Sequence, residues 1–201
     1  MTACNSGEQR LMPSDTHYFS GEFVYMADAA VFYDCATGAH YPVSQQDAYL
    51  ETERKYMDLK PEPGQRVFVE LKGALDSLPG MEEGTKVRAL VIESLIGFDP
   101  SVSCQKSFMA AGLYEALDKD SVKTVLHLRP DYTLAVTRYL PDSTQVTSDG
   151  TWGMASATEV ELNIPDKEGL LTHTRLQIDP QQETLMHGKG KHEIQYKKIY
   201  I

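Results

Sequence analysis

The chain has 201 residues and a formal net charge of −10, with 41% hydrophobic and 24% charged residues. This composition is that of an ordinary globular protein, long enough to bury the core of one large β domain or two small ones. Residues 1–104 hold 8 Lys+Arg and 16 Asp+Glu, whereas residues 105–201 hold 11 and 13. So acidic a chain repels phosphate backbones, which makes nucleic acid a poor partner. No segment approaches the roughly 20 apolar residues of a membrane-spanning helix.

Small residues precede Cys4 and polar residues follow it. This pattern resembles the end of a bacterial lipoprotein signal, where export is followed by acylation of the Cys and by cleavage just before it. The charged start and apolar stretch of a full signal are not in the sequence, which indicates a chain trimmed near its maturation site. The resemblance implies a lipid anchor on Cys4, and Asn5 after it favours the outer membrane. The alternative is an ordinary cytosolic start with a chance Cys.

Residues 1–17 are predicted to form a flexible tether between the lipid and the first domain. The segment up to Asp15 is polar and contains Gly7, Pro13 and several Ser and Thr residues. Such a composition is typical of linkers that do not pack into a core.

The first domain is expected over residues 18–104. Residues 18–25 partly alternate and are rich in aromatic and β-branched side chains, which predicts a strand. Residues 31–33 and 40–43 flank a turn-like segment at 36–38, as in a β-hairpin.

A short amphipathic helix is predicted next, because apolar and aromatic residues recur at helical spacing from Tyr49 to Met57, before Pro61. Residues 66–73 alternate cleanly, and residues 86–98 have the composition of another long strand. Strands, one helix and then further strands are the pattern of a small OB-like barrel.

A continuous motif runs from Gly21 to Gly38, and single signposts follow it up to Cys104. The residues are GEFVYMADAAVFYDCATG, then Tyr41-Pro42-Val43, Glu51, Glu53, Tyr56, Pro63-Gly64, Gly73, Met81-Glu82 and Cys104. This set of residues resembles the OB domain of the NlpE family. Members of this family are outer-membrane lipoproteins linked to copper homeostasis and to envelope-stress and surface sensing. The resemblance therefore implies a sensing or binding role rather than catalysis.

The resemblance also implies a disulfide between Cys35 and Cys104, two of the three cysteines. The bond would close a loop of about 70 residues, for which the chain-entropy model gives ~4 kcal/mol of stabilisation. In the family an analogous bridge is thought to report on oxidative folding, so the bond is either a structural staple or a redox sensor. The alternative of two buried free thiols requires a reducing compartment and conflicts with the lipoprotein-like amino terminus.

The second domain, residues 105–201, is predicted to contain strands and turns throughout. Residues 122–128 and 132–139 alternate around a turn at 129–131. Further strands are expected near 151–155, 158–164, 169–178, 182–187 and 193–200. Seven or eight short strands in sequence indicate an up-and-down barrel or half-barrel.

This half resembles, more weakly, the other domain of the NlpE family, a lipocalin-like barrel. The matching residues are Gly112-x-Tyr114-Glu115, Leu126-x-Leu128-x-Pro130-Asp131-Tyr132-Thr133 and Gly150-Thr151-Trp152. Two departures stand out: the OB-like domain comes first, which reverses the usual order, and residues 117–121 lack the family's Cys-x-x-Cys. The thiol copper site of the family therefore cannot be carried over to this chain.

Three residues near the carboxyl terminus form the candidate metal site. Met186, His187 and His192 offer thioether and imidazole ligands that suit Cu(I). The alternative is a solvated hairpin tip, because Gly188 and Gly190 lie between them. A second set, Met26, Asp28 and Asp34, also invites a metal hypothesis, although two carboxylates on a strand edge are usually just solvated.

Trp152 is the candidate ligand-lining residue of the barrel, and a core role is the alternative. The strand histidine His127 is expected to be packed or hydrogen-bonded. No nucleophile elbow, P-loop, dinucleotide fingerprint or zinc-protease motif occurs in the sequence, so neither catalysis nor a cofactor is expected.

The sequence thus predicts a mainly β protein, with an OB-like small barrel followed by an antiparallel lipocalin-like barrel or half-barrel. The expected function is that of a non-catalytic outer-membrane lipoprotein that faces the periplasm and binds an envelope protein or reports on envelope state, including copper. The alternatives are a barrel that carries a small apolar ligand and a metal-binding protein that uses the Met/His cluster.

Overall fold

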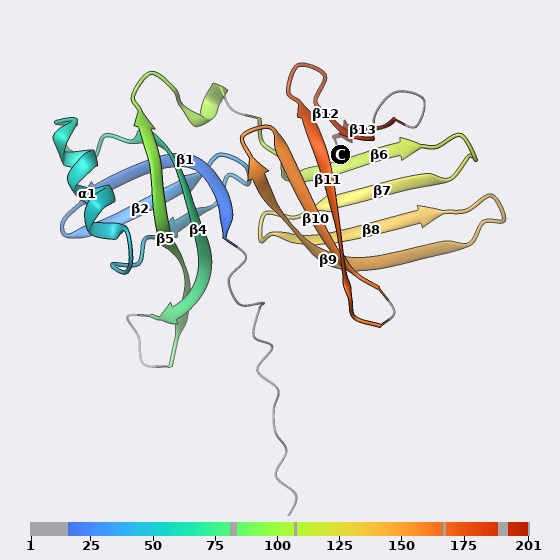
Figure 1. The fold of residues 1–201 in the computed structure, drawn as a ribbon, viewed down its shortest axis with the longest axis horizontal. Helices are drawn as coiled ribbons and strands as arrows, with labels where there is room; N and C mark the ends of the chain where they lie inside the picture. The colour runs from blue at the N-terminus through green and yellow to red at the C-terminus, as the bar shows by residue number, and fades with distance from the viewer. Residues whose placement is uncertain (1–15, 81–83, 107, 167, 189–192, 201) are drawn as a thin grey trace, which may run out of the picture.

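The computed structural model describes residues 16–80, 84–106, 108–166, 168–188 and 193–200. Within them the chain forms thirteen strands, one α-helix and the short 3₁₀ helix η1 (Cys104–Lys106). Two β units lie side by side along the long axis of the molecule (Figure 1). Cys4 and most of the predicted tether lie outside the described residues, and the first strand begins at His17, the last residue of that tether.

The first unit has the connectivity of an OB fold. Its elements are β1 (His17–Met26), β2 (Ala29–Asp34), β3 (His40–Pro42), α1 (Tyr49–Asp58), β4 (Val67–Pro79) and β5 (Lys86–Asp99). β1 pairs antiparallel with both β2 and β4, β2 pairs with β3, and β4 pairs with β5. A parallel bridge between Val43 and Leu90 closes the five strands into a barrel. The predicted OB architecture, with its single helix between the third and fourth strands, is confirmed.

α1 packs against the barrel through one face. Tyr49, Thr52 and Tyr56 are its buried residues, at the helical spacing expected of a core-facing stripe. The Tyr56 ring lies edge-on to Phe23, with 5.4 Å between centroids, and its hydroxyl donates to the Gln65 carbonyl at 2.6 Å. The helix is therefore held by packing and by the segment that follows it.

β4 is longer than predicted, because β5 supplies hydrogen-bonding partners along the whole hairpin. The pairing shifts register twice, between Glu70 and Leu71 and between Lys72 and Gly73. Such bulges bend and twist a ribbon, which lets two long strands wrap around a small barrel. At Gly73 an added Cβ would lie 2.2 Å from the Val91 carbonyl oxygen, so the close approach of the two backbones requires glycine.

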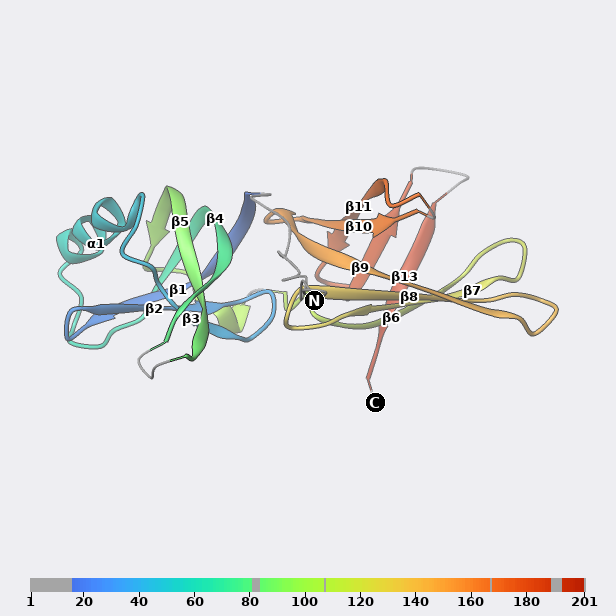
Figure 2. The same ribbon diagram turned by 90° about the horizontal axis from the view of Figure 1, so that it is seen from below.

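The second unit is a closed, eight-stranded antiparallel barrel. Its strands are β6 (Gly112–Leu117), β7 (Lys123–Leu128), β8 (Thr133–Tyr139), β9 (Gln145–Ser156), β10 (Glu159–Pro165), β11 (Leu171–Asp179), β12 (Thr184–His187) and β13 (Ile194–Ile199). Each strand pairs with the next, and β13 pairs with β6 to complete the ring. The up-and-down topology is as predicted, and the closed barrel replaces the half-barrel alternative. Figure 2 shows that β13 crosses the β6–β9 layer at a steep angle.

Apolar side chains fill the barrel over the half that faces the OB unit. The fully or nearly buried ones are Tyr114, Leu126, Leu128, Leu134, Val136, Trp152, Val160, Leu162, Leu176 and Leu185. They belong to the same cluster of buried residues as Phe19, Phe32, Leu71 and Leu90 of the OB unit. The molecule therefore has one continuous core. Within the part of the chain that the structure describes, no helix combines the length and apolarity needed to cross a bilayer.

Candidate functional site at the domain junction

The β7–β8 turn projects from the barrel into the OB unit. Tyr132 has a φ of +67°, and its backbone N–H donates to the Arg129 carbonyl at 3.0 Å. Trp152 of β9 holds the turn in place with two hydrogen bonds. Its indole N–H donates to the Arg129 carbonyl at 2.9 Å, and its backbone N–H donates to the Tyr132 carbonyl. A left-handed backbone is costly for a bulky residue and persists only where the surroundings hold it. The turn thus presents the Tyr132 ring to the other domain.

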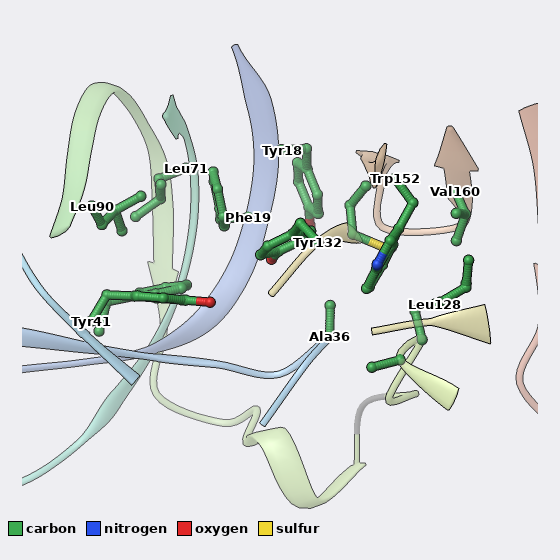
Figure 3. Close-up of a cluster of buried hydrophobic side chains, with 14 of the residues drawn as sticks. Tyr18, Phe19, Ala36, Tyr41, Leu71, Leu90, Leu128, Tyr132, Trp152 and Val160 are labelled. Atoms are coloured by element: carbon green, nitrogen blue, oxygen red, sulfur yellow. The ribbon is translucent and has the colours of Figure 1, made fainter. Parts of the chain in front are cut away.

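Tyr132 lies between aromatic side chains of both domains. Its ring centroid is 4.9 Å from that of Trp152 and 6.0 Å from that of Phe19, which it meets edge-on. Figure 3 shows the ring in this position between β1 and β9. Edge-on and tilted pairs of this kind are the preferred arrangements of aromatic rings in cores.

The Tyr132 hydroxyl donates a 2.5 Å hydrogen bond to the carboxylate of Asp34, the last residue of β2. Asp34 is 2% exposed and also accepts hydrogen bonds from the Ala36 backbone and the Thr37 hydroxyl. Burial raises the pKa of Asp34 even though these three donors oppose the shift. The pKa of Tyr132 is raised well above its ordinary value, by burial and by the neighbouring carboxylate.

The disulfide lies in the same turn. Cys35 follows Asp34 directly and is bonded to Cys104, which is 69 positions further on. The pairing implied by the family resemblance is therefore present in the structure. The Ala36 carbonyl accepts the Ala111 backbone N–H at 2.9 Å, and the Cys104 backbone N–H donates to the Glu22 carboxylate at 3.1 Å. Consequently the bond links the Asp34 turn to the segment that leads into the barrel.

Further contacts close the junction around its buried centre. Arg88 of β5 donates to the Asp131 carbonyl at 2.8 Å, and Tyr41 approaches the Pro130 carbonyl at 3.5 Å. β1 and β9 also pair directly, through Tyr18 and Met154. The two domains therefore share hydrogen bonds, a strand contact and a core at one place, which we call the domain junction: Asp34–Thr37, Cys104, Ala110–Ala111, Arg129–Tyr132 and Trp152.

Two of the three predicted metal ligands, Met186 and His187, lie among the described residues. Met186 receives a weak contact from the Thr184 hydroxyl at 3.8 Å, and the His187 ring lies 3.5 Å from the Arg175 carbonyl oxygen. His192, the third predicted ligand, is outside the described residues. Among the described residues no group of three or more His, Cys, Asp or Glu side chains is placed to hold a metal ion.

The second predicted set of ligands, Met26, Asp28 and Asp34, has separate surroundings. Met26 is 65% exposed, the Asp28 carboxylate accepts the Tyr25 hydroxyl at 3.2 Å, and Asp34 is buried in the junction. Trp152, the predicted ligand-lining residue, is 1% exposed and occupied by its contacts with Arg129 and Tyr132. His127 lies on a barrel strand, and burial lowers its pKa.

The Asp34–Tyr132 pair escaped sequence reasoning. The sequence placed Asp34 in the first family motif and in a metal hypothesis, and it placed Tyr132 in the second, weaker motif. The available signal was this membership in two family motifs, which marked both residues without pairing them. Their separation of 98 residues leaves no local pattern that could pair them.

Comparison with known proteins shows which family the first domain resembles. Residues 13–105 match the family model of the NlpE C-terminal OB domain. The first domain of this chain is therefore similar to that family over just under half of the chain. The NlpE assignment thus agrees with the OB connectivity and with the disulfide that ends the matched region.

Two further comparisons, one of sequence and one of structure, match NlpE of Escherichia coli. The chain is 28% identical over 96 residues to "Lipoprotein NlpE" of Escherichia coli (strain K12), a match that covers 48% of this chain and 39% of that protein. It is also similar to the crystal structure of the Cpx pathway activator NlpE from Escherichia coli, with a TM-score of 0.42 and 26% identity over 52% of this chain and 53% of that one. The chain thus spans well under two thirds of either relative. The assignment of residues 105–201 to the other NlpE domain, in reversed order, stays a prediction.

Proposed function

We propose that this chain is a non-catalytic envelope lipoprotein, anchored through Cys4 in the outer membrane and facing the periplasm, that reports on envelope state through contact with another protein. The observation that carries the proposal is the NlpE-type OB domain whose disulfide lies in the domain junction. The matched relative is named a lipoprotein, and the solved one an activator of the Cpx pathway. The sequence similarity to that lipoprotein supports a role in envelope-stress signalling.

The junction supports a redox-dependent version of this function. Cys35 lies between Asp34, which binds Tyr132 of the barrel, and Ala36, which binds the interdomain segment at Ala111. Loss of the bond between Cys35 and Cys104 frees the turn that holds both contacts. Reduction should therefore loosen the docking of the barrel on the OB domain and change the surface that a partner meets.

Two experiments test the proposal. The first is expression of the full-length gene in its native host, with metabolic labelling by a palmitate analogue and membrane fractionation, beside a Cys4→Ala variant. Acylation and membrane association that both depend on Cys4 are expected, and a protein that is neither acylated nor membrane-associated would exclude the anchor. The second compares an envelope-stress reporter in cells that carry the wild type, Cys35→Ala or Cys104→Ala at matched protein levels. Identical reporter output from all three would exclude redox reporting.

The two alternative functions have less support. A carrier of a small apolar ligand needs an open barrel interior, whereas the half of the barrel beside the junction is filled by side chains that include Trp152. A metal buffer would need Met186 and His187 to converge with a third ligand, whereas Met186 contacts the Thr184 hydroxyl and His187 contacts the Arg175 carbonyl. A Cu(I) competition titration of the wild type against a variant with His187→Ala and His192→Ala tests the metal alternative directly.

A further inference from the structure

The barrel is closed by a short seam between β6 and β13. The three residue pairs of this seam are Glu115 with Lys197, Tyr114 with Lys198 and Leu113 with Ile199. β6 continues to Leu117, and β13 begins at Ile194. In the same register Gln195 would lie opposite Leu117, but the two strands separate before that point.

The strand edges that separate are each still paired on their other side. Leu117 pairs with Lys123 of β7, and Gln195 pairs with Met186 of β12. A groove of about 870 Å³ lies between the two edges. Its walls are Ala116, Leu117 and Lys119 on the β6 side and Ile194, Gln195 and Lys197 on the β13 side.

The backbone groups of these edges point into the groove. The Asp118 N–H donates to the Val122 carbonyl across the β6–β7 hairpin, so Leu117, one residue earlier, turns its N–H and C=O away from β7. The Lys198 N–H donates in the same way to the Glu183 carbonyl, and the alternation places the N–H and C=O of Gln195 away from β12. Each wall therefore presents a donor and an acceptor that β6 and β13 do not satisfy for each other.

The side chains of the groove suit an extended chain with little net charge. Leu117 is 70% exposed on the rim, which offers apolar surface to cover. Lys123 and Glu115 form a 2.7 Å ion pair, so their charges are mutually satisfied. The remaining charges balance, because Lys119 and Lys197 on the walls are matched by Asp118 and Glu193 at the ends.

We propose that the open end of the β6–β13 seam binds an extended, weakly charged peptide segment of a partner protein as an added β-strand. Main-chain hydrogen bonds to Leu117 or Gln195 supply the affinity, and the alternate side chains meet Ala116 and Ile194 on one face and the charged rim on the other. An inserted strand runs antiparallel to one edge and parallel to the other, since β6 and β13 are mutually antiparallel. This inference names the contact that the proposed function requires, and it rests on that function only for placing the partner in the envelope.

The test uses the full chain in solution and a capped, fluorescently labelled peptide of alternating threonine and valine. Binding is measured by fluorescence anisotropy, and protection of individual amides by hydrogen exchange. We expect saturable binding and slower exchange of the Leu117 or Gln195 amide, with little change at Glu115 and Lys197, which are already paired. A peptide of the same sequence that is N-methylated at alternate residues loses the donors of one edge, and it should bind at least about tenfold more weakly.

Proline variants identify the edge that is used. Leu117→Pro and Gln195→Pro each remove an N–H that points into the groove, a position at which proline is tolerated because no strand pairs with that N–H. The variant at the edge used should bind the peptide about tenfold more weakly. Two control variants distinguish backbone recognition from nonspecific hydrophobic binding. Leu117→Thr keeps the N–H that points into the groove, and Tyr139→Thr removes another exposed apolar side chain.

Three results would overturn the proposal. The first is no binding up to millimolar peptide. The second is that the N-methylated peptide binds as tightly as the unmethylated one. The third is that both proline variants, with intact circular dichroism spectra, bind the peptide as tightly as the wild type does. Amide protection that rises with protein concentration in the absence of peptide would assign the seam to a second copy of this chain instead. None of these readouts depends on acylation, so the seam and the lipoprotein function can fail separately.

Discussion

Asp34 is held between the backbone of its own turn and a hydroxyl group from the other domain, with 2% of its surface exposed. A carboxylate in that position costs desolvation free energy, which the three donors offset in part. Tyr132 bears the corresponding strain on the barrel side, with its left-handed backbone. The residue-scale predictions concern this pair.

The first prediction is that Asp34→Asn gains stability relative to the wild type as the pH rises. Burial raises the pKa of Asp34 in the folded chain, so its contribution to the free energy of unfolding is fully present below the ordinary aspartate pKa and is lost as the pH passes the raised value. Urea unfolding from about pH 4 to about pH 7.5 measures the difference. Asp131→Asn should show the opposite slope. Burial acts to raise the pKa of Asp131, but the hydrogen bonds from Thr133 and the charges of the nearby arginines together outweigh burial and lower it. A difference that does not vary with pH would contradict the assignment for Asp34.

The second prediction is that Tyr132→Phe lowers the free energy of unfolding by about 1.5–3 kcal/mol, the usual range for a hydrogen bond to a charged group. Tyr41→Phe is the matched control, because its hydroxyl lies 3.5 Å from the Pro130 carbonyl oxygen, at the limit of a hydrogen bond. We expect the control to cost less than about 0.5 kcal/mol. Equal losses of the two variants in chemical denaturation would show that the hydrogen bond to Asp34 stabilises the fold no more than the Tyr41 contact does.

At the scale of elements, the β4–β5 hairpin depends on close backbone approach at one bulge. An added Cβ at Gly73 would lie 2.2 Å from the Val91 carbonyl oxygen, whereas one at Gly97 in the same hairpin would meet nothing within 4 Å. The two glycines therefore have different roles although both lie in long strands.

The third prediction follows from this difference. Gly73→Ala should destabilise the protein by about 1–3 kcal/mol, because the backbones must separate to admit the methyl group. Gly97→Ala should be neutral or stabilise by up to about 1 kcal/mol, since alanine reduces the entropy of the unfolded chain. Thermal unfolding of both variants measures the two effects, and a comparable loss in each would refute the role given to the bulge.

At the scale of the whole molecule, the buried residues of the two domains form one cluster. Phe19, Tyr132 and Trp152 connect the two barrels, and β1 pairs with β9 beside them. Domains that share a core lose each other's support when one unfolds, which favours a cooperative transition.

The fourth prediction is therefore a single unfolding transition, with superimposable curves from far-ultraviolet circular dichroism and from the fluorescence of Trp152, the one tryptophan. Replacement of both Cys35 and Cys104 by alanine should lower the free energy of unfolding by about 4 kcal/mol in the chain-entropy model. Two separate transitions in the oxidised wild type would contradict the shared core.

The sequence by itself determined the elements and the architecture. Side-chain alternation is a local property, and it located most of the strands and the helix that begins at Tyr49. β6 was not among the strands predicted from alternation, although its Gly112 and Tyr114 carry the family resemblance. The motif around Cys35 indicated the resemblance to the OB family, and this resemblance implied the disulfide. The long β4 and β9 were underestimated, because strand length depends on the partners available across the ladder rather than on local composition.

Only the tertiary structure decided what these elements do together. It placed Asp34 against Tyr132 and buried Trp152, a candidate ligand platform in the sequence, beneath the β7–β8 turn. It also left the β6–β13 seam open beyond Glu115, although both strands continue. Such features depend on residues that are distant in the chain, and on strand crossing and closure, which local periodicity does not encode.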